Sequence, residues 1–409
     1  MTVASDRPII GTSKDPDSFL AGEEAAKIAY KQLPSDVHPK WMLVFSGGRH
    51  DPEMIHKGIQ SVVGNVPIVG GSAVGIITND KISYTGHECS IAIFCGAGGE
   101  PLILTADRLD QGEFEAGKCL GEQLKQNAED NRSVIVFYDS VRSVPPPVLN
   151  VGSLLMDGLS EGLGDKPLNI FGAGLVGDLQ YSTSFLFDGE KPCKHTAMAI
   201  VLPSTWLGNT TIMHGCTPLS NFLEITRIEG PVIYELEGRP ALDVLIERVS
   251  PTGEGISEIN FPMTIALGAK YGDPYASFDE SFYVSRLIMD VNPENGTVTL
   301  FEADFKTGQK VQIMSRNNEV VLDSVQQQTQ RVLDSLDSDD FRWAFYIDCA
   351  GRTSAFCGAE TEEASILQRV LGNALPLFGF YSGVELASFL GRTRPLDWSG
   401  VLTVFTQKR

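Results

Sequence analysis

Apolar runs of strand length recur along the chain, and a stretch with the periodicity of a helix separates the two members of each pair. The second run of each pair ends in glycines and follows a proline, at Pro67, Pro167 or Pro376. Self-similarity of this kind is typical of an internal repeat. The unit occurs clearly twice and more faintly a third time, in WMLVFSG (41–47) with NVPIVGGSAVG (65–75), SVIVFYD (133–139) with PLNIFGAGLVGD (167–178), and FRWAFYIDCAGR (341–352) with ALPLFGFYSGVE (374–385).

The repeated unit predicts a strand, a helix, a second strand and then an antiparallel addition. Strands joined through a helix lie parallel, and such a crossover is almost always right-handed. Turn residues around Asn79-Asp80 and Asp188-Gly189 then predict hairpins, and another apolar run follows each of them. We therefore expect an α/β fold of mixed, largely antiparallel sheets with covering helices, built from repeated β-α-β-β units in two domains.

Two further helices and a domain boundary follow from the same pattern. One helix begins after the capping residues Asp17 and Ser18, and another covers 322–336 with a glutamine run on its exposed side. Between 215 and 240, glycines and prolines interrupt a stretch that has little periodicity. We place the division there, with two copies of the unit in 1–225 and the third in 226–409, which also holds the expected ligand site.

The charge of the chain excludes two classes of partner. Its 409 residues carry a formal net charge of -20, whereas phosphate-rich surfaces require clustered Lys and Arg. We therefore expect neither nucleic acid nor a membrane among its partners. No apolar run reaches the roughly 18 to 20 residues of a membrane helix, and the N-terminus lacks the pattern of a signal peptide. We expect a cytoplasmic protein.

The cysteines and histidines do not form a metal or disulfide pattern. The seven cysteines have irregular spacings, with no CxxC pair and no histidine at a zinc-like distance. His50 and His56 are six residues apart, which places them on neither one helix face nor a strand face with a third ligand. We expect no metal ion and no cofactor.

Gly172, Gly174 and Gly177 spell GxGxxG after an apparent strand, as in dinucleotide-binding folds. The following run, LQYSTSFLFDG, alternates like a strand, so no helix N-terminus would face a pyrophosphate. Equivalent glycines in the third copy, Gly379 and Gly383, favour turns that every copy requires for close packing. The alternative is that these turns line a pocket.

Cys349 and Arg352 stand together where an apolar strand ends. A guanidinium beside the thiol would favour the thiolate and make it reactive. A nucleophilic enzyme also needs a positioned base, and all six histidines lie in 1–225, outside the expected domain that holds Cys349. We expect a buried or ligand-lining cysteine, and the alternative of catalysis by Cys349 stays open.

Four charged residues of the C-terminal part lie at or near the ends of apolar segments: Arg286, Arg352, Glu363 and Glu385. Guanidinium and carboxylate groups around one pocket would clamp a zwitterion at both ends. An internal set of salt bridges with no ligand is the alternative.

Several segments resemble the FIST family, the F-box and intracellular signal transduction domains, over nearly the whole chain. They are VPIVGGSAVG, NIFGAGLVGD, ITRIEGPVIYELEGRPALDVL, FPMTIAL, SRLIMDVNPENGTVTL, DCAGR and PLFGFYSGVEL. The resemblance implies a sensory module for small ligands, with amino acids the suggested class, and a partner that carries the output, since no F-box is recognisable. By motif position it places the following residues around the family's C-terminal site: Cys349, Gly351, Arg352, Glu363, Gly379 and Glu385.

The hypothesis from the sequence is therefore a signal-transduction sensor that binds an amino acid or similar small metabolite and is not an enzyme. Arg286 joins the six residues above as an expected ligand contact. Two alternatives stay open: an enzyme with Cys349 as its nucleophile, and a protein-interaction scaffold without a small ligand.

Overall fold

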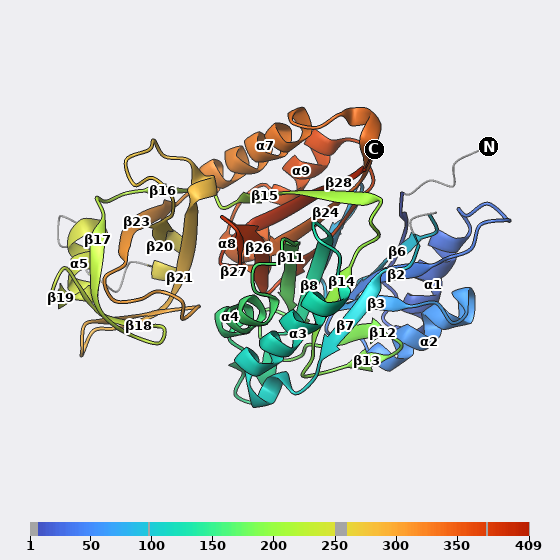
Figure 1. Cartoon of the computed structure of the whole chain (residues 1–409), viewed down its shortest axis with the longest axis horizontal. Coiled ribbons are helices and arrows are strands. Elements are labelled where there is room, and N and C mark those ends of the chain that lie inside the picture. Colours follow the sequence, from blue (N-terminus) through green and yellow to red (C-terminus); the bar gives the residue numbers. More distant parts are fainter. Residues whose placement is uncertain (1–6, 97–98, 250–259, 374, 409) are drawn as a thin grey trace.

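Three six-stranded sheets form the body of the molecule in the computed structural model, which describes residues 7–96, 99–249, 260–373 and 375–408 (Figure 1). In each sheet two neighbouring strands are parallel and all other pairings are antiparallel. The first sheet has the order β1 (Ile9–Ser13), β6 (Cys89–Phe94), β2 (Trp41–Ser46), β3 (Ile68–Ser72), β12 (Leu186–Gly189) and β13 (Pro192–Cys193).

The other two sheets have strands in corresponding places. The second runs β7 (Leu102–Ala106), β14 (Ala197–Val201), β8 (Ser133–Asp139), β11 (Asn169–Leu175), β26 (Val384–Phe389) and β27 (Arg392–Leu396). The third runs β15 (Trp206–Met213), β28 (Gly400–Gln407), β24 (Phe341–Cys349), β25 (Leu377–Ser382), β4 (Gly75–Thr78) and β5 (Ile82–Ser83).

The last two strands of every sheet come from a different part of the chain. The hairpin of β4 and β5 follows β3 of the first sheet but pairs with β25 of the third. The hairpin of β12 and β13 follows β11 but pairs with β3, and the hairpin of β26 and β27 follows β25 but pairs with β11. This exchange runs in a ring, so each sheet is completed by a strand pair from a neighbour.

Pairs of helices cover the outer face of each sheet, as Figure 1 shows for α3 and α4 over the second sheet. The pairs are α1 (Ser18–Tyr30) with α2 (Pro52–Val63), α3 (Glu113–Asn127) with α4 (Gly152–Leu163), and α7 (Asn318–Asp334) with α9 (Glu363–Leu371). Asp17 caps α1 by accepting a hydrogen bond from the Leu20 N–H, which satisfies a backbone donor that the first turn leaves free.

Aromatic side chains fill the space where the three sheets face one another. Phe45 of β2 stacks on Phe380 of β25 with ring centroids 3.8 Å apart, and meets Phe137 of β8 edge to face at 5.6 Å. These rings belong to one buried cluster with strands of all three sheets. Burial of this apolar area holds the sheets together.

A separate lobe is inserted between β15 and α7 (Figure 1). Its strands β23, β17, β18, β22, β21 and β20 pair in that order, and β20 pairs again with β23, so the sheet closes on itself. The bounds are β16 (Cys216–Pro218), β17 (Leu223–Glu229), β18 (Val232–Leu236), β19 (Arg239–Pro240), α5 (Ala241–Val249), α6 (Phe261–Thr264), β20 (Ile265–Lys270), β21 (Tyr283–Asn292), β22 (Thr297–Leu300) and β23 (Lys310–Arg316).

Short elements complete the described chain. Body and lobe also contain β9 (Val141–Ser143), β10 (Val148–Leu149), α8 (Ser354–Cys357) and the 3-10 turns η1 (Leu109–Gln111), η3 (Glu280–Phe282), η4 (Ser338–Asp340) and η5 (Ala350–Arg352).

The expected fold class is confirmed: mixed, largely antiparallel sheets carry covering helices. Each unit is longer than the sequence pattern predicts, because a further strand and helix precede each β-α-β crossover. The division at 225/226 falls inside β17 of the lobe, so it stays a prediction about sequence segments.

The sequence predicts a strand directly after Gly177, and the first half of this prediction is wrong. Only Leu186–Gly189 is extended in a sheet, because Asp178 accepts hydrogen bonds from the Gln180 and Ser182 N–H groups and turns the chain there.

The close packing of the parallel strands β8 and β11 requires a residue without a side chain at Gly172. A Cβ at this position would lie 1.8 Å from the Val136 carbonyl oxygen of β8. We expect Gly172→Ala to lower the unfolding free energy by more than about 3 kcal/mol, at the upper end for overpacked cores. Gly112→Ala, where a Cβ meets nothing within 4 Å, is the control in urea unfolding. Equal stability of the two variants would contradict this packing.

Candidate functional site

A cavity of about 200 Å³ lies where the lobe meets the body. The body contributes the carboxyl ends of three strands: Val176 follows β11, Cys349 ends β24 and Ser382 ends β25. The lobe contributes Leu287, Met289 and Phe301, so neither part encloses the cavity alone. The remaining lining residues are Asp178, Leu179, Tyr181, Ala350, Gly351, Phe356, Gly383, Asp397 and Trp398.

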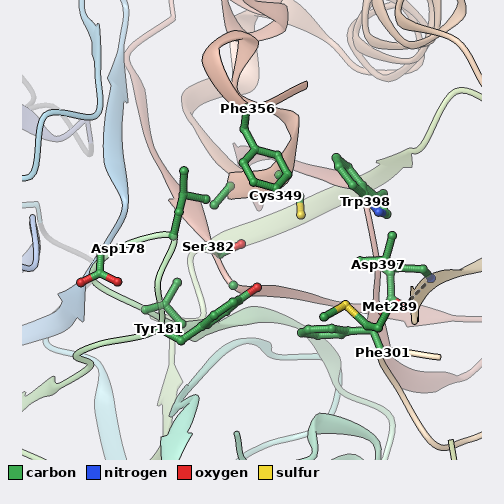
Figure 2. Close-up of a pocket in the computed structure, with 15 residues that line it drawn as sticks. Asp178, Tyr181, Met289, Phe301, Cys349, Phe356, Ser382, Asp397 and Trp398 are labelled. Carbon is green, nitrogen blue, oxygen red and sulfur yellow. Dashed lines mark hydrogen bonds between the residues drawn. The ribbon is translucent and has the colours of Figure 1, made fainter. Parts of the chain in front are cut away.

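The walls are mainly apolar and aromatic. Figure 2 shows Tyr181 and Phe301 along one side of the cavity, with Phe356 and Trp398 across from them. Tyr181 and Trp398 both have left-handed backbone conformations, with φ of 54° and 55°. Such a conformation is uncommon for a bulky residue and costs energy that the surrounding structure must offset.

Asp397 supplies a carboxylate to the cavity wall, and it also joins the lobe to the body. Its Oδ2 accepts a hydrogen bond from the Leu287 N–H at 2.9 Å, and its Oδ1 lies 3.4 Å from a guanidinium nitrogen of Arg286. Burial raises the pKa of Asp397 to about 6, although Arg286 acts in the opposite direction.

Arg286 is fully buried beside this wall and is not among the residues that line the cavity. Its Nε and one terminal nitrogen bind both oxygens of Asp304, each at 2.7 Å, and it also donates to the Pro395 carbonyl. Despite burial, these carboxylates raise the pKa of Arg286 further above its ordinary value, so the group stays charged.

Glu385 lies directly behind the cavity wall. It is fully buried and accepts hydrogen bonds from Ser382 Oγ at 2.7 Å and from the Ser399 N–H at 3.3 Å. Burial raises the pKa of its carboxyl to about 8, so at neutral pH it is mainly the protonated acid.

Cys349 lines the cavity with a half-buried thiol (Figure 2). Burial, and next the negative charge of Glu385, raise the pKa of this thiol well above its ordinary value. Arg352 acts in the opposite direction, but burial and the nearby acids outweigh the effect of the guanidinium. At neutral pH the sulfur is a thiol.

Arg352 and Glu363 form a buried pair beneath the cavity. Arg352 donates from Nε and a terminal nitrogen to the two oxygens of Glu363, at 2.7 and 2.8 Å. Its other terminal nitrogen donates to the carbonyls of Met213 and Trp398. Tyr346 donates to Glu363 as well, at 2.8 Å. The guanidinium thus joins three segments of the chain and is not directed into the cavity.

The two glycines of the expected site have different positions. Gly351 lines the cavity, and a Cβ there would lie 2.9 Å from the Trp398 ring. Gly379 sits within β25, where a Cβ would lie 2.4 Å from the Tyr346 carbonyl oxygen. Gly379 therefore serves strand packing.

Of the residues expected from the sequence, the structure brings Cys349 and Gly351 to the cavity and Glu385 directly behind it. Arg286, Arg352, Glu363 and Gly379 do not line it. Sequence reasoning missed Tyr181, Phe301, Asp397 and Trp398. An aspartate and tryptophan directly after the last hairpin were a signal, but nothing local showed that the lobe would cover them.

Among the described residues, no three His, Cys, Asp or Glu side chains are grouped so that they could hold a metal ion. Within the same residues, no helix combines the length and apolar character needed to cross a bilayer.

Comparison with known proteins gives matches along most of the chain. The family model of the FIST N domain matches residues 40–239, and that of the FIST C domain matches 241–388. "Uncharacterized protein Rv0628c" of Mycobacterium tuberculosis (strain ATCC 25618 / H37Rv) is 21% identical over 397 residues, covering 97% of this chain and 98% of the relative. "Uncharacterized protein Mb0898c" of Mycobacterium bovis (strain ATCC BAA-935 / AF2122/97) is 24% identical over 401 residues, with the same coverage.

Two solved structures show weak likeness. A crystal structure of chorismatase has a TM-score of 0.33 and 10% identity, covering 92% of this chain and 95% of that one. A cyanuric acid hydrolase from A. caulinodans has a TM-score of 0.34 and 10% identity, covering 98% and 100%. With TM-scores this low, neither neighbour informs the function of this chain.

The buried Arg352–Glu363 pair predicts a stability effect that is separate from ligand binding. Arg352→Met would leave the buried Glu363 without its ion-pair partner and two carbonyls without their donor, and we expect the unfolding free energy to fall by about 3–5 kcal/mol, as for other broken buried pairs. Arg369→Met is the control, because Arg369 is exposed and lies on α9, the helix that carries Glu363. We expect it to change the unfolding free energy by less than about 0.5 kcal/mol. Similar urea midpoints for both variants would argue against the pair.

Glu385 predicts a pH dependence of folding stability. Its pKa is about 8 in the folded state and near 4.5 when unfolded, so between these values only the folded state keeps the proton. The free energy of unfolding is therefore highest, as far as Glu385 determines it, at low pH. It falls as the pH rises from about 4.5 to about 8, by up to about 1.4 kcal/mol per pH unit. Glu385→Gln should gain stability relative to the wild type from pH 5 to 8 in urea unfolding. A constant difference would contradict the raised pKa.

Proposed function

The chain belongs to the FIST family, and from this premise we propose that it is a sensory protein of signal transduction that binds a small molecule in the cavity between body and lobe. FIST domains belong to signal-transduction proteins. The observation that carries the proposal is that both parts of the molecule supply walls to one cavity.

A shared cavity gives binding a means of changing the protein. A ligand there contacts Leu287, Met289 and Phe301 of the lobe together with Cys349 and Trp398 of the body. Such a ligand binds most tightly to the conformation in which the lobe and the body both line the cavity. It therefore shifts the population of molecules toward that conformation. A partner that recognises the position of the lobe would then read out the bound state.

The backbone of the cavity supports the same proposal. Tyr181 and Trp398 have left-handed conformations on opposite sides of it. Strained residues of this kind concentrate at functional sites, where their side chains must take one particular place. Both rings face a space that the protein itself does not fill.

Size and lining favour a small metabolite. At about 200 Å³, the cavity lies below the usual range of about 300–1,000 Å³ for ligand pockets. The preference for an amino acid stays a prediction. Its carboxylate would need a cation, whereas Arg286 and Arg352 are both held by internal carboxylates, which favours the internal salt-bridge alternative for these residues.

Catalysis by Cys349 is the weaker candidate. The raised pKa keeps the sulfur as a neutral thiol, and no histidine is among the described residues that line the cavity. A base would be needed to remove the proton during attack. A scaffold without any small ligand would have no use for two strained aromatic residues around an open cavity.

A screen of metabolites by thermal shift and native mass spectrometry tests the proposal. Met289, on the lobe side and 44% exposed, and Met54, on α2 and 37% exposed, form a matched pair. Met289→Trp should fill part of the cavity and weaken any ligand found with the wild type by tenfold or more. Met54→Trp should bind it normally.

A ligand that binds both variants equally would lie elsewhere, and the proposed site would be wrong. A screen without any ligand would count for the scaffold alternative.

A further inference from the structure

A second, smaller chamber adjoins the cavity and gives information on the chemistry of the ligand. Its volume is about 50 Å³, and it shares Tyr181, Phe301 and Gly383 with the larger cavity. We call the larger space the outer chamber and the smaller one the inner chamber. The inner one is lined in addition by Ser140, Leu149, Asn150, Val151, Glu302 and Val384. About 30 Å³ holds one water molecule, so the inner chamber fits a small polar head.

Glu302 supplies a carboxylate to the inner chamber. It reaches from the lobe to the first turn of α4, where its Oε2 accepts a hydrogen bond from the Ser153 N–H at 2.9 Å. A helix N-terminus favours a negative charge at this place. For the other oxygen, Oε1, no hydrogen bond is found among the described residues, and it remains free to accept one.

Two buried hydroxyls lie near this carboxylate. Tyr138 is fully buried and Ser140 is 3% exposed, and neither hydroxyl meets the geometry of a hydrogen bond to another described group. A Cβ built on Gly152 would lie 2.6 Å from Tyr138 Oη and 2.9 Å from Glu302 Oε1. Ser140 lines the inner chamber, whereas Tyr138 is not among its lining residues. Buried polar atoms without partners are uncommon, so the Ser140 hydroxyl is available to a ligand group in the chamber.

Three carboxyl groups are buried around the two chambers, those of Glu302, Asp397 and Glu385. Arg286 is bound to Asp304 and Asp397, and Arg352 to Glu363. None of the described residues that line either chamber is a lysine, arginine or histidine. Burial and the charge of Asp397 raise the pKa of Glu302 to about 7, although Arg286 acts in the opposite direction.

We propose that the site binds a small organic cation, a primary amine whose ammonium group occupies the inner chamber and whose apolar body fills the outer chamber. This inference rests on the proposed function and specifies the ligand class for the same site. The ammonium donates to the two acceptors that line the inner chamber, Glu302 Oε1 and Ser140 Oγ. Arg286 acts on the Glu302 carboxylate but binds Asp304 and Asp397, so the ammonium supplies Glu302 with a direct ion pair.

The walls distinguish an amine from other ligands. Tyr181 and Phe301 belong to both chambers, and aromatic faces attract an organic cation. An inorganic cation would lose its hydration shell against the apolar outer walls without enough ligands to replace it. A carboxylate in either chamber would face Glu302 or Asp397 with no cation on the wall.

Matched compounds test the proposal directly. Butylamine, isopentylamine and benzylamine are compared by calorimetry and thermal shift with the corresponding alcohols, the corresponding carboxylates and the amino acid phenylglycine. We expect at least one amine to bind, and its alcohol, carboxylate and amino acid counterparts to bind at least tenfold more weakly or not at all.

Glu302→Gln and Ser140→Ala locate the head group. The amide oxygen introduced by Glu302→Gln can still accept from the Ser153 N–H, so this variant should stay folded by circular dichroism and lose at least tenfold in amine affinity. Ser140→Ala should weaken amine binding several-fold without altering the binding of the carboxylates. Glu161→Gln, at an exposed position on α4, is the control and should bind as the wild type.

The outcomes separate this inference from the proposed function. Binding of a carboxylate or phenylglycine in preference to every amine would overturn the amine assignment and leave a small-molecule sensor. Unchanged amine affinity in Glu302→Gln would overturn the inner chamber as the place of the head group. No binding by any compound here, together with an empty metabolite screen, would overturn both.

Discussion

The buried ion pair between Arg286 and Asp397 is the constraint on which the site depends. Arg286 lies on β21 of the lobe, and Asp397 follows the last hairpin of the body. Separating the two members of such a pair leaves a buried charge without its partner. The pair therefore stabilises the position in which the lobe contacts the body. Asp397 also accepts the Leu287 N–H and lines the outer chamber. The position of the lobe and the shape of the cavity thus depend on one carboxylate.

The same low-dielectric surroundings determine the chemistry of the cavity. Burial raises the pKa of Glu385, Glu302 and Asp397 and keeps Cys349 as a thiol. Among these acids Glu302 forms no ion pair with a described residue, whereas Asp397 is paired with Arg286. A neutral thiol with no histidine among the described lining residues is a poor nucleophile. The Glu302 carboxylate suits a site where a bound cation pairs with it and holds lobe and body together.

The sequence predicted the body well, because apolar runs and helical periodicity depend on neighbours along the chain. Cys349 and Gly351, expected at a strand end, line the cavity, and their part in binding stays a prediction. Sequence reasoning failed where a side chain meets a distant partner. Arg352 is occupied by Glu363, the Met213 carbonyl and the Trp398 carbonyl, which no local pattern shows. Tyr181 reaches the cavity through the turn at Asp178, and Glu302 reaches α4 only because an inserted lobe folds over the body.

Hydrogen exchange by mass spectrometry, with and without a bound ligand, tests whether lobe and body share one ligand site, because it shows which parts of the chain the ligand touches or holds. We expect slower exchange on both sides of the cavity, in 176–181 and 349–356 of the body and in 287–301 of the lobe, with exchange in α1 and α2 unchanged. Protection confined to the body, or to α1 and α2, would contradict a site shared by lobe and body.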